Sequence, residues 1–366
     1  MTAGIDVSVV TSGHDVADAR LHREVAALRR AGLTVEVLAL GLTSDAPAGC
    51  AVHTEARAGA WRRAYLAATL PWRARGRVVL VLDPDAAIGA YARRVLGGGR
   101  AALVADVHED YGSLLADRAW AAGLTGRLAR GLARAGQWAA AHADLTVVAD
   151  AHLLPRAPRR LVVRNLPDPA MLPPGGAGTP DRRPRALYVG DLRDSRGLFT
   201  MVDAVRAAPD WQLDLVGPLA RRDQAKLSQA LSAEPGLADR LALLGRQAPA
   251  PAWSHAVGAW AGLLLLQDTP AFRASMPSKI YEYLACGLPV ITTPLPRPAA
   301  LVGETGAGRV VADAAEAAAV LREWSADPAA YGAAAAAARA ARGRAVAEAD
   351  EMALFGARLA RLAGRG

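Results

Sequence analysis

Lys279 and Glu282 are the two side chains whose types and spacing most clearly indicate chemistry. They lie three residues apart in the segment SMPSKIYEYLACGLPVITT, residues 275–293, and residues at that spacing project from one face of a helix. A lysine offers a compact ammonium to a bound diphosphate, and a carboxylate can accept hydrogen bonds from both hydroxyls of a ribose. Arginine supplies nearly every other positive charge, because Lys226 is the only other lysine. The alternative is an ordinary lysine–glutamate pair on a solvated helix face.

The helix that carries these residues is expected to begin at the ligand edge of a sheet. Ser275 can cap it with Pro277 in its first turn, and Gly287 can end it in a left-handed conformation. The strand LPVITT, residues 288–293, follows directly. Ligands of open α/β sheets bind at the carboxyl edge, and helix N-termini attract phosphates. The first turn, which includes Ser278, is therefore predicted to bind a diphosphate.

A second polar cluster follows the strand AALVADV, residues 101–107, in the first half of the chain. His108 at this strand end could hydrogen-bond a sugar or a developing charge, and Glu109 could orient the histidine or accept a proton from an acceptor. A lone histidine is more often structural, but a His-Glu-Asp run at the carboxyl end of a strand favours a site.

Other residue patterns argue against a metal site, a disulfide, a kinase-like NTPase and an ordinary dehydrogenase. Asp83 and Asp85 resemble a metal-binding Asp-x-Asp, but they begin a helix after a strand, and capping explains them better. Cys50 and Cys286 form no spacing pattern, which indicates a reducing cytosol. No cluster has metal-ligand spacing, and no P-loop or Gly-x-Gly-x-x-Gly follows the first strand. We therefore expect no metal and no cofactor.

Alternating short apolar runs and longer helical patterns must position these residues, and this alternation is typical of βαβ units around parallel sheets. A helix is predicted over residues 17–31. The predicted strands of the first half are residues 5–10, 34–40, 77–83, 101–107, 144–150 and 160–165. Those of the second half are residues 186–190, 212–217, 240–245, 262–267 and 288–293.

A segment dense in proline and glycine separates the two halves. It places an N-terminal domain at residues 1–167, a linker at 168–185 and a C-terminal domain at 186–345. Residues 346–366 are expected to form a C-terminal helix that packs back on the first domain. The alanine-rich tail from Asp313 onward could be disordered, but its aromatic and aliphatic residues favour ordered helix.

Composition limits the classes of protein to which the chain could belong. The chain has 366 residues, 52% of them hydrophobic, and a formal net charge of +8 that favours anionic partners. No leader or membrane-spanning run is evident, so we expect a cytoplasmic protein. Arginine alternates with tryptophan and leucine in residues 61–77 and 124–138, which would allow peripheral contact with the inner face of a membrane. Ordinary amphipathic helices are the alternative, and no nucleic-acid-binding module is present.

The segment SKIYEYLACGLPVI resembles the donor-binding helix of GT-B glycosyltransferases of family 4, the group 1 type. Weaker likenesses follow in matching order: VTSGHDVADARLHREVAALRRAGLTVEVL, VADVHEDYG, VVRNLPDPAML, ALYVGDLRDSRGLFTMVDAV, LDLVGP and LALLG. The resemblance implies two Rossmann-like, doubly wound domains facing across a cleft. It also implies that the second domain holds a nucleotide sugar and the first holds the acceptor.

The resemblance places several residues in the site. Glu282 falls on the family's ribose-binding glutamate. In GDLRDSRG, residues 190–197, Gly190 and Arg196 match positions that face the diphosphate, and Arg193 is a further candidate. The loop with His14 and Asp15 is expected to contact the acceptor or the diphosphate, although Asp15 and Asp18 could instead cap a helix.

Two departures from the family pattern concern the same site. Family members often have a second glutamate where this chain has Ala274, and an arginine where it has Asp191. The donor sugar and its base therefore cannot be inferred from the sequence. Arg193 and Lys279 could replace the missing positive charge beside the diphosphate.

The function expected from these residues and this resemblance is transfer of a sugar from a nucleotide diphosphate sugar to a hydroxyl or amine acceptor. The resemblance implies retention of configuration. The acceptor would be a small molecule or a lipid-linked saccharide. The alternatives are a nucleotide-sugar 2-epimerase and a catalytically silent partner of another transferase.

Overall fold

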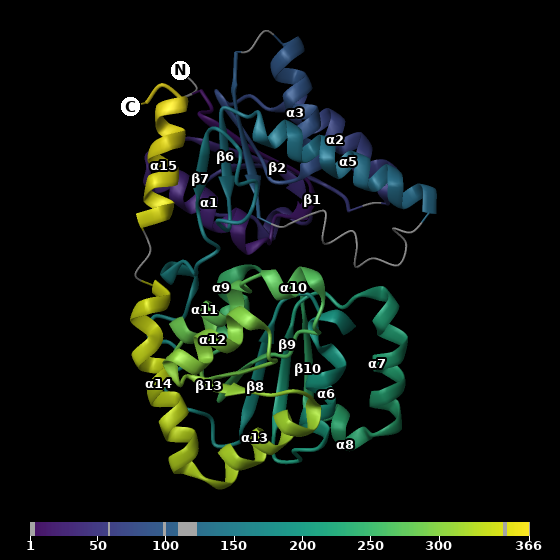
Figure 1. Ribbon diagram of the computed structural model, residues 1–366, viewed down its shortest axis with the longest axis vertical. Coiled ribbons are helices and arrows are strands. Elements are labelled where there is room, and N and C mark those ends of the chain that lie inside the picture. The colour runs from purple at the N-terminus through teal and green to yellow at the C-terminus, as the bar shows by residue number, and fades with distance from the viewer. Residues whose placement is uncertain (1–3, 58, 98–99, 109–122, 347–349, 366) are drawn as a thin grey trace. The chain divides into compact units, whose positions relative to one another are not determined.

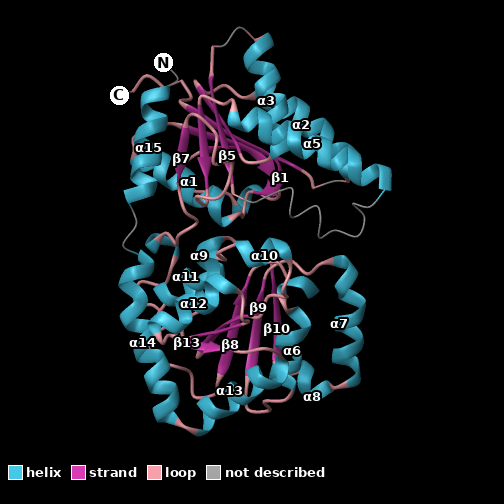
Figure 2. Ribbon diagram, in the orientation of Figure 1, coloured by secondary structure: helices cyan, strands magenta, loops and turns pink. Residues whose placement is uncertain are grey.

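The computed structural model describes residues 4–57, 59–97, 100–108, 123–346 and 350–365 (Figure 1). The chain divides into two units. The first is Met1–Asn165 together with Ala349–Gly366, and the second is Leu166–Glu348. Each unit has one parallel sheet with helices on both faces (Figure 2).

The sheet of the first unit has seven strands in the order β3-β2-β1-β4-β5-β6-β7. The strands are β1 (Val7–Asp15), β2 (Val35–Leu40), β3 (Ala51–Glu55), β4 (Val78–Val81), β5 (Ala102–Val107), β6 (Leu145–Val148) and β7 (Arg160–Val162). The helices are α1 (Ala19–Arg30), α2 (Ala60–Arg73), α3 (Pro84–Leu96), α5 (Gly123–Ala141) and α15 (Asp350–Leu362), with a 3-10 turn at Thr43–Asp45. The strand order reverses between β1 and β4, and this is where open α/β sheets bind ligands.

Strand alternation divides the core of the first unit between the two faces of the sheet. Val7 and Val9 pack with α1 and α15, and Val10 packs with α2 and α3. Phe355 of α15 is fully buried in the former layer. The C-terminal helix thus belongs to the first unit, where it covers the sheet beside α1.

The sheet of the second unit has six strands in the order β10-β9-β8-β11-β12-β13. The strands are β8 (Arg185–Val189), β9 (Gln212–Val216), β10 (Leu241–Gly245), β11 (Ala261–Leu264), β12 (Val290–Thr292) and β13 (Gly308–Val310). The longer helices are α6 (Leu198–Arg206), α7 (Arg221–Ala233), α11 (Ser278–Ala285), α12 (Pro296–Thr305), α13 (Ala314–Ala326) and α14 (Pro328–Val346). The shorter helices are α8 (Pro235–Ala238), α9 (Pro249–Ser254) and α10 (Pro270–Ala274), with 3-10 turns at Pro169–Met171 and Asp194–Arg196.

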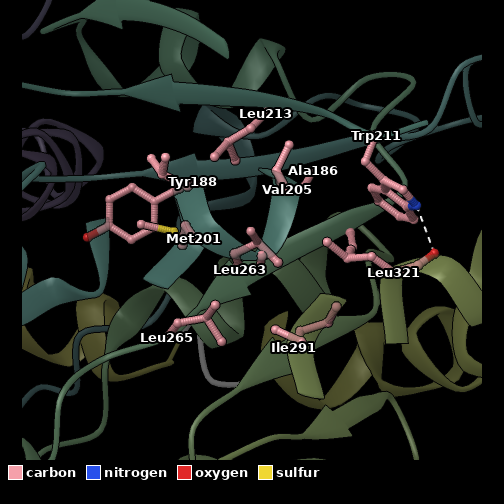
Figure 3. Close-up of a cluster of buried hydrophobic side chains, with 14 of the residues drawn as sticks. Ala186, Tyr188, Met201, Val205, Trp211, Leu213, Leu263, Leu265, Ile291 and Leu321 are labelled. Carbon is pink, nitrogen blue, oxygen red and sulfur yellow. Dashed lines mark hydrogen bonds between the residues drawn. The ribbon is translucent and has the colours of Figure 1, made fainter. Parts of the chain in front are cut away.

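One face of this sheet packs against α6 and α13, and the other against α9, α11 and α14. Figure 3 shows the first of these layers, in which Trp211 donates from Nε1 to the carbonyl of Leu321 at 2.7 Å. The hydrogen bond satisfies the polar atom of a fully buried indole.

Residues 168–185, which the sequence predicted as a linker, lie in the second unit. Leu172 and Ala177 are buried in its core. The amide of Ala177 donates to the carbonyl of Cys286 at 2.7 Å, so this segment is fastened to the end of α11. Proline and glycine here shape a packed loop, and the chain crosses between the units at residues 165–166 and 348–349.

Candidate functional site

The carboxyl edge of the second sheet gathers positive side chains around one carboxylate. Asp191 follows β8, Arg193 directly precedes the next 3-10 turn and Arg196 ends it, and Arg246 follows β10. Helix α11 begins at Ser278 and brings Lys279 to the same group. Burial tends to raise the pKa of Asp191, but Arg196, Arg193, Lys279 and Arg246 outweigh it and lower that pKa. Four cations around one carboxylate leave an excess of positive charge, which suits an anion with several charges.

Lys279 owes its position to the absence of a side chain at Gly190. A Cβ on Gly190, which has a φ of +142°, would lie 2.6 Å from the lysine Nζ and 2.3 Å from its Cε. The Nζ also lies 5.4 Å from the ring centroid of Tyr188, within cation–π range. Gly190, Tyr188 and Lys279 therefore form one packed group at the end of β8.

The charge state of Lys279 depends on its surroundings. Burial lowers its pKa to about 8, with help from Arg196 and Arg193, while Glu282 and Asp191 oppose the shift. Across the described residues, no hydrogen bond or ion pair to the Lys279 ammonium is found. An anion that reaches this ammonium would raise its pKa again and gain a charge-assisted contact.

Glu282 lies one turn into α11 on the same side as Lys279. Its residue surface is 5% exposed, and the Ser278 hydroxyl donates to its Oε2 at 3.4 Å. The neighbouring Tyr283 is fully buried and donates to the carbonyls of Leu187 and Leu263 at 3.1 and 3.3 Å, which fixes the helix on the sheet. The predicted group of Ser278, Lys279 and Glu282 is thus held together on a rigid helix.

The predicted cap of this helix is wrong. Helix α11 begins at Ser278, with Pro277 in the capping position and no capping hydrogen bond from its side chain. Ser275 instead ends the preceding helix α10, and its hydroxyl donates to the carbonyl of Phe272 at 3.2 Å. Proline has no side-chain oxygen that could accept a hydrogen bond, so the first amides of α11 are not used by a side-chain cap. Gly287 ends the helix with a φ of +74°, as predicted.

A second polar cluster lies at the carboxyl edge of the first sheet. His14 near the end of β1 and His108 after β5 face each other, with 3.1 Å between their Nε2 atoms. Asp83, which follows β4, lies 3.0 Å from His14 Nδ1, and Asp106 of β5 lies 3.3 Å from His108 Nδ1. Glu109, predicted as a partner of His108, lies outside the described residues. The structure therefore brings together the two predicted histidines, although they are 94 residues apart.

Three predicted caps have different outcomes in this unit. Asp18 caps α1 by accepting from the amides of Arg20 and Leu21. Asp15 accepts from the amide of Ala17 at 3.1 Å and lies 3.7 Å from Arg57. Asp83 occupies the capping position of α3 but makes no capping hydrogen bond, because its carboxylate turns toward the end of β1. Asp83 therefore occupies the predicted capping position, but its side chain does not cap the helix.

Several residues of the two clusters were not predicted. Asp106 accepts hydrogen bonds from both Nε and Nη2 of Arg20 at 2.5 Å. Arg246 joins the cations of the second unit. A signal for Asp106 was available, because a carboxylate within the apolar strand AALVADV requires a buried partner. Arg246 follows a strand that ends in glycine, which is the same pattern that singled out Gly190.

Within the described ranges, no group of three or more histidine, cysteine, aspartate or glutamate side chains could hold a metal ion. In the same part of the chain, no helix is long and apolar enough to cross a bilayer.

Comparison with known proteins finds a family model that is similar to part of the second unit. A sequence model of the family "Glycosyl transferases group 1" matches residues 183–327. This match covers β8 to α13 and includes every candidate residue of the cation cluster. A search of curated protein sequences finds no match.

Solved structures resemble the whole chain in fold. Sucrose-phosphate synthase from Thermosynechococcus elongatus aligns over 97% of this chain and 98% of its own, with 16% identity and a TM-score of 0.71. WaaG, a glycosyltransferase of lipopolysaccharide biosynthesis, aligns over 98% and 100%, with 15% identity and a TM-score of 0.66. Anabaena HepE in complex with UDP aligns over 98% and 100%, with 16% identity and a TM-score of 0.65. The chain therefore has the two-domain GT-B fold of these structures, and residues 183–327 of its second unit resemble the group 1 glycosyltransferase domain.

Proposed function

We propose that the chain transfers a sugar from a nucleoside diphosphate sugar and that the cation cluster of the second unit binds the diphosphate. The observation that carries this proposal is the position of Lys279 above Gly190 beside Arg193 and Arg196. A diphosphate needs several positive charges in a partly dry environment, and this group provides them at the carboxyl edge of the sheet.

Glu282 would bind the ribose hydroxyls beside Lys279. A carboxylate accepts hydrogen bonds but cannot donate them, so it suits two adjacent hydroxyl groups. The HepE structure contains UDP, and another structure of HepE contains UDP-glucose. We therefore choose UDP as the first nucleotide to test, with GDP, dTDP and ADP as competitors.

Chemistry at the sugar would need no metal ion in this proposal. The cations of the second unit would stabilise the departing diphosphate, as a metal does elsewhere. Retention of configuration would follow from attack on the same face that the diphosphate leaves, with the diphosphate accepting the proton of the acceptor. His108 would lie beside the sugar and Glu109 beside His108. Asp15 would contribute to the acceptor loop.

Exposed apolar side chains on the first unit support a lipid-linked acceptor and a peripheral, cytoplasmic location. Trp61 of α2 is 92% exposed and Leu128 of α5 is 75% exposed, and both helices carry arginines. Both helices pack against α3 (Figure 1). Apolar side chains beside arginines suit the headgroup region of an anionic membrane. A small-molecule acceptor remains the other proposal, and transfer in the absence of lipid would favour it.

Thermal unfolding with each nucleotide tests the donor site. A ligand that binds only the native state adds RT ln(1 + [L]/Kd) to stability, about 2.7 kcal/mol at 100 times Kd. We expect one nucleotide to raise the unfolding temperature of the wild type, and Glu282→Ala to lose that rise. Glu304→Ala is the control, because Glu304 is an exposed glutamate of α12. No shift with any nucleotide at millimolar concentration would contradict the proposal and favour a catalytically silent partner. Isomerisation of the donor without acceptor would favour an epimerase.

A further inference from the structure

Two imidazole rings meet at the carboxyl edge of the first sheet. His14 and His108 approach with ring centroids 4.8 Å apart and planes at 66°, and their Nε2 atoms are 3.1 Å apart. Strand β4 lies between β1 and β5 in the sheet, so the rings come together across the end of β4. At 3.1 Å, two ring nitrogens are within hydrogen-bond distance.

Asp83 fixes the proton on the outer nitrogen of His14. Its Oδ2 accepts from the amides of Ser12 at 2.9 Å and Gly13 at 3.1 Å and from the Thr11 hydroxyl. Burial tends to raise the pKa of Asp83, but His14, with help from Arg63 and the Thr11 hydroxyl, outweighs it and holds that pKa well below its usual range. An ionised carboxylate only accepts, so His14 Nδ1, which lies 3.0 Å from Asp83 Oδ1, carries a proton.

Asp106 fixes the outer nitrogen of His108 in the same way. Arg20 donates to both carboxylate oxygens at 2.5 Å, and this bidentate pair is buried. Burial tends to raise the pKa of Asp106, but Arg20 and His108 outweigh it and hold that pKa well below its usual range. His108 Nδ1 lies 3.3 Å from Asp106 Oδ2 and therefore also carries a proton.

The two inner nitrogens then require one more proton. A neutral imidazole carries one proton, and in both rings that proton is on Nδ1. Without another proton, two Nε2 lone pairs would face each other at 3.1 Å, which is repulsive. We propose that His14 and His108 share one additional proton between their Nε2 atoms and that the pair carries a single positive charge. The part of this proposal that concerns catalysis, in which His14 positions His108, rests on the proposed function.

The charges around the pair favour this additional proton. Asp83 lies 3.0 Å from the outer nitrogen of His14, and Asp106 lies 3.3 Å from that of His108. Burial tends to raise the pKa of Asp18, but His14 and His108 outweigh it and lower that pKa. A positive charge on the pair is therefore stabilised by three nearby carboxylates.

The shared proton changes what His108 can do. With Nδ1 donating to Asp106 and Nε2 bound to His14, the His108 ring presents a share of the positive charge of the pair, and its orientation is held from both sides. His14 is thus a positioning residue, and it sets both the direction and the charge of the His108 ring.

Nitrogen-15 NMR of the histidine side chains tests the shared proton without any substrate. The chain has 7 histidines, and the variants His14→Gln and His108→Gln assign the two rings. Near pH 7 we expect both Nδ1 atoms to be protonated and both Nε2 shifts to lie between the bare and the protonated values. His14→Gln should turn His108 Nε2 into an ordinary bare or fully protonated nitrogen. The methyl NMR spectrum of this variant should match that of the wild type, which shows that the fold is retained.

His152→Gln is the matched control, because His152 lies 2.9 Å from Asp150 and is not part of the pair. It should remove only its own signals. Two fully bare Nε2 atoms in the wild type, or a His108 signal that His14→Gln leaves unchanged, would overturn the proposal. If either glutamine variant unfolds, the nitrogen-15 shifts of the wild type and of the other variant still test the shared proton. Loss of turnover, by contrast, would concern the proposed function and not the shared proton.

Discussion

Nucleotide binding should weaken as the pH rises from 7 to 9, because Lys279 loses its proton in this range. Its pKa is lowered to about 8 from the usual 10.5, so about nine-tenths of the side chains are charged at pH 7 and about one-tenth at pH 9. The phosphates of the nucleotide keep their charge, since their last ionisation lies near pH 6. The apparent Kd should therefore rise about tenfold, or about 1.4 kcal/mol, over these two pH units.

Calorimetric titration with UDP at pH 7, 8 and 9 and constant ionic strength measures this change. Lys279→Arg should bind with nearly constant affinity, because an arginine stays charged throughout the range. Lys226→Arg should keep the wild-type dependence, because Lys226 is exposed on α7 and lies over the ring of Phe199. If Lys279→Arg showed the same tenfold loss as the wild type, Lys279 would not be the titrating group and the reasoning would be refuted.

Three further predictions concern stability, and urea unfolding monitored by tryptophan fluorescence checks each. Gly197→Ala should cost at least about 2 kcal/mol, because Gly197 has a φ of +81° and a Cβ would lie 1.9 Å from the Leu265 carbonyl oxygen; an unchanged midpoint would count against this steric argument. Arg20→Met should cost about 3–5 kcal/mol, because it leaves Asp106 buried without its partner, and a neutral effect would show that the pair is dispensable. Phe355→Ala should also cost about 3–5 kcal/mol, because the ring is fully buried in the first unit; a loss below about 1 kcal/mol would mean that α15 is not anchored by this ring.

Local patterns explain how much of the fold was predictable. Apolar runs placed most strands to within a few residues, and the tail that was predicted to be helical contains α13, α14 and α15. Strand β3, AVHTE, was missed because it is half polar and lies at the edge of the sheet. Strand β13 was missed because it has only three residues. Short edge strands bury little surface, so their sequences carry a weak signal.

In the candidate site too, the arrangement within one helix was predictable from the sequence, whereas contacts between distant strands were not. Lys279 and Glu282 were predictable because their spacing within one helix puts them on one face. The contact between His14 and His108 depends on β4 lying between β1 and β5, and no local pattern indicates that order. Asp83 was interpreted as a helix cap for the same reason. Its position in the chain is that of a cap, but its partners come from the neighbouring strand.

Protection of Lys279 from chemical modification by UDP tests the central claim most directly. The chain has two lysines, so reductive methylation followed by mass spectrometry of the peptides measures the cluster and an internal reference together. The account predicts that saturating UDP slows modification of Lys279 at least about tenfold and leaves Lys226 unchanged, because the diphosphate would cover the ammonium and raise its pKa. Equal modification of Lys279 with and without UDP, in a sample that calorimetry shows to be saturated, would place the nucleotide elsewhere and contradict the account.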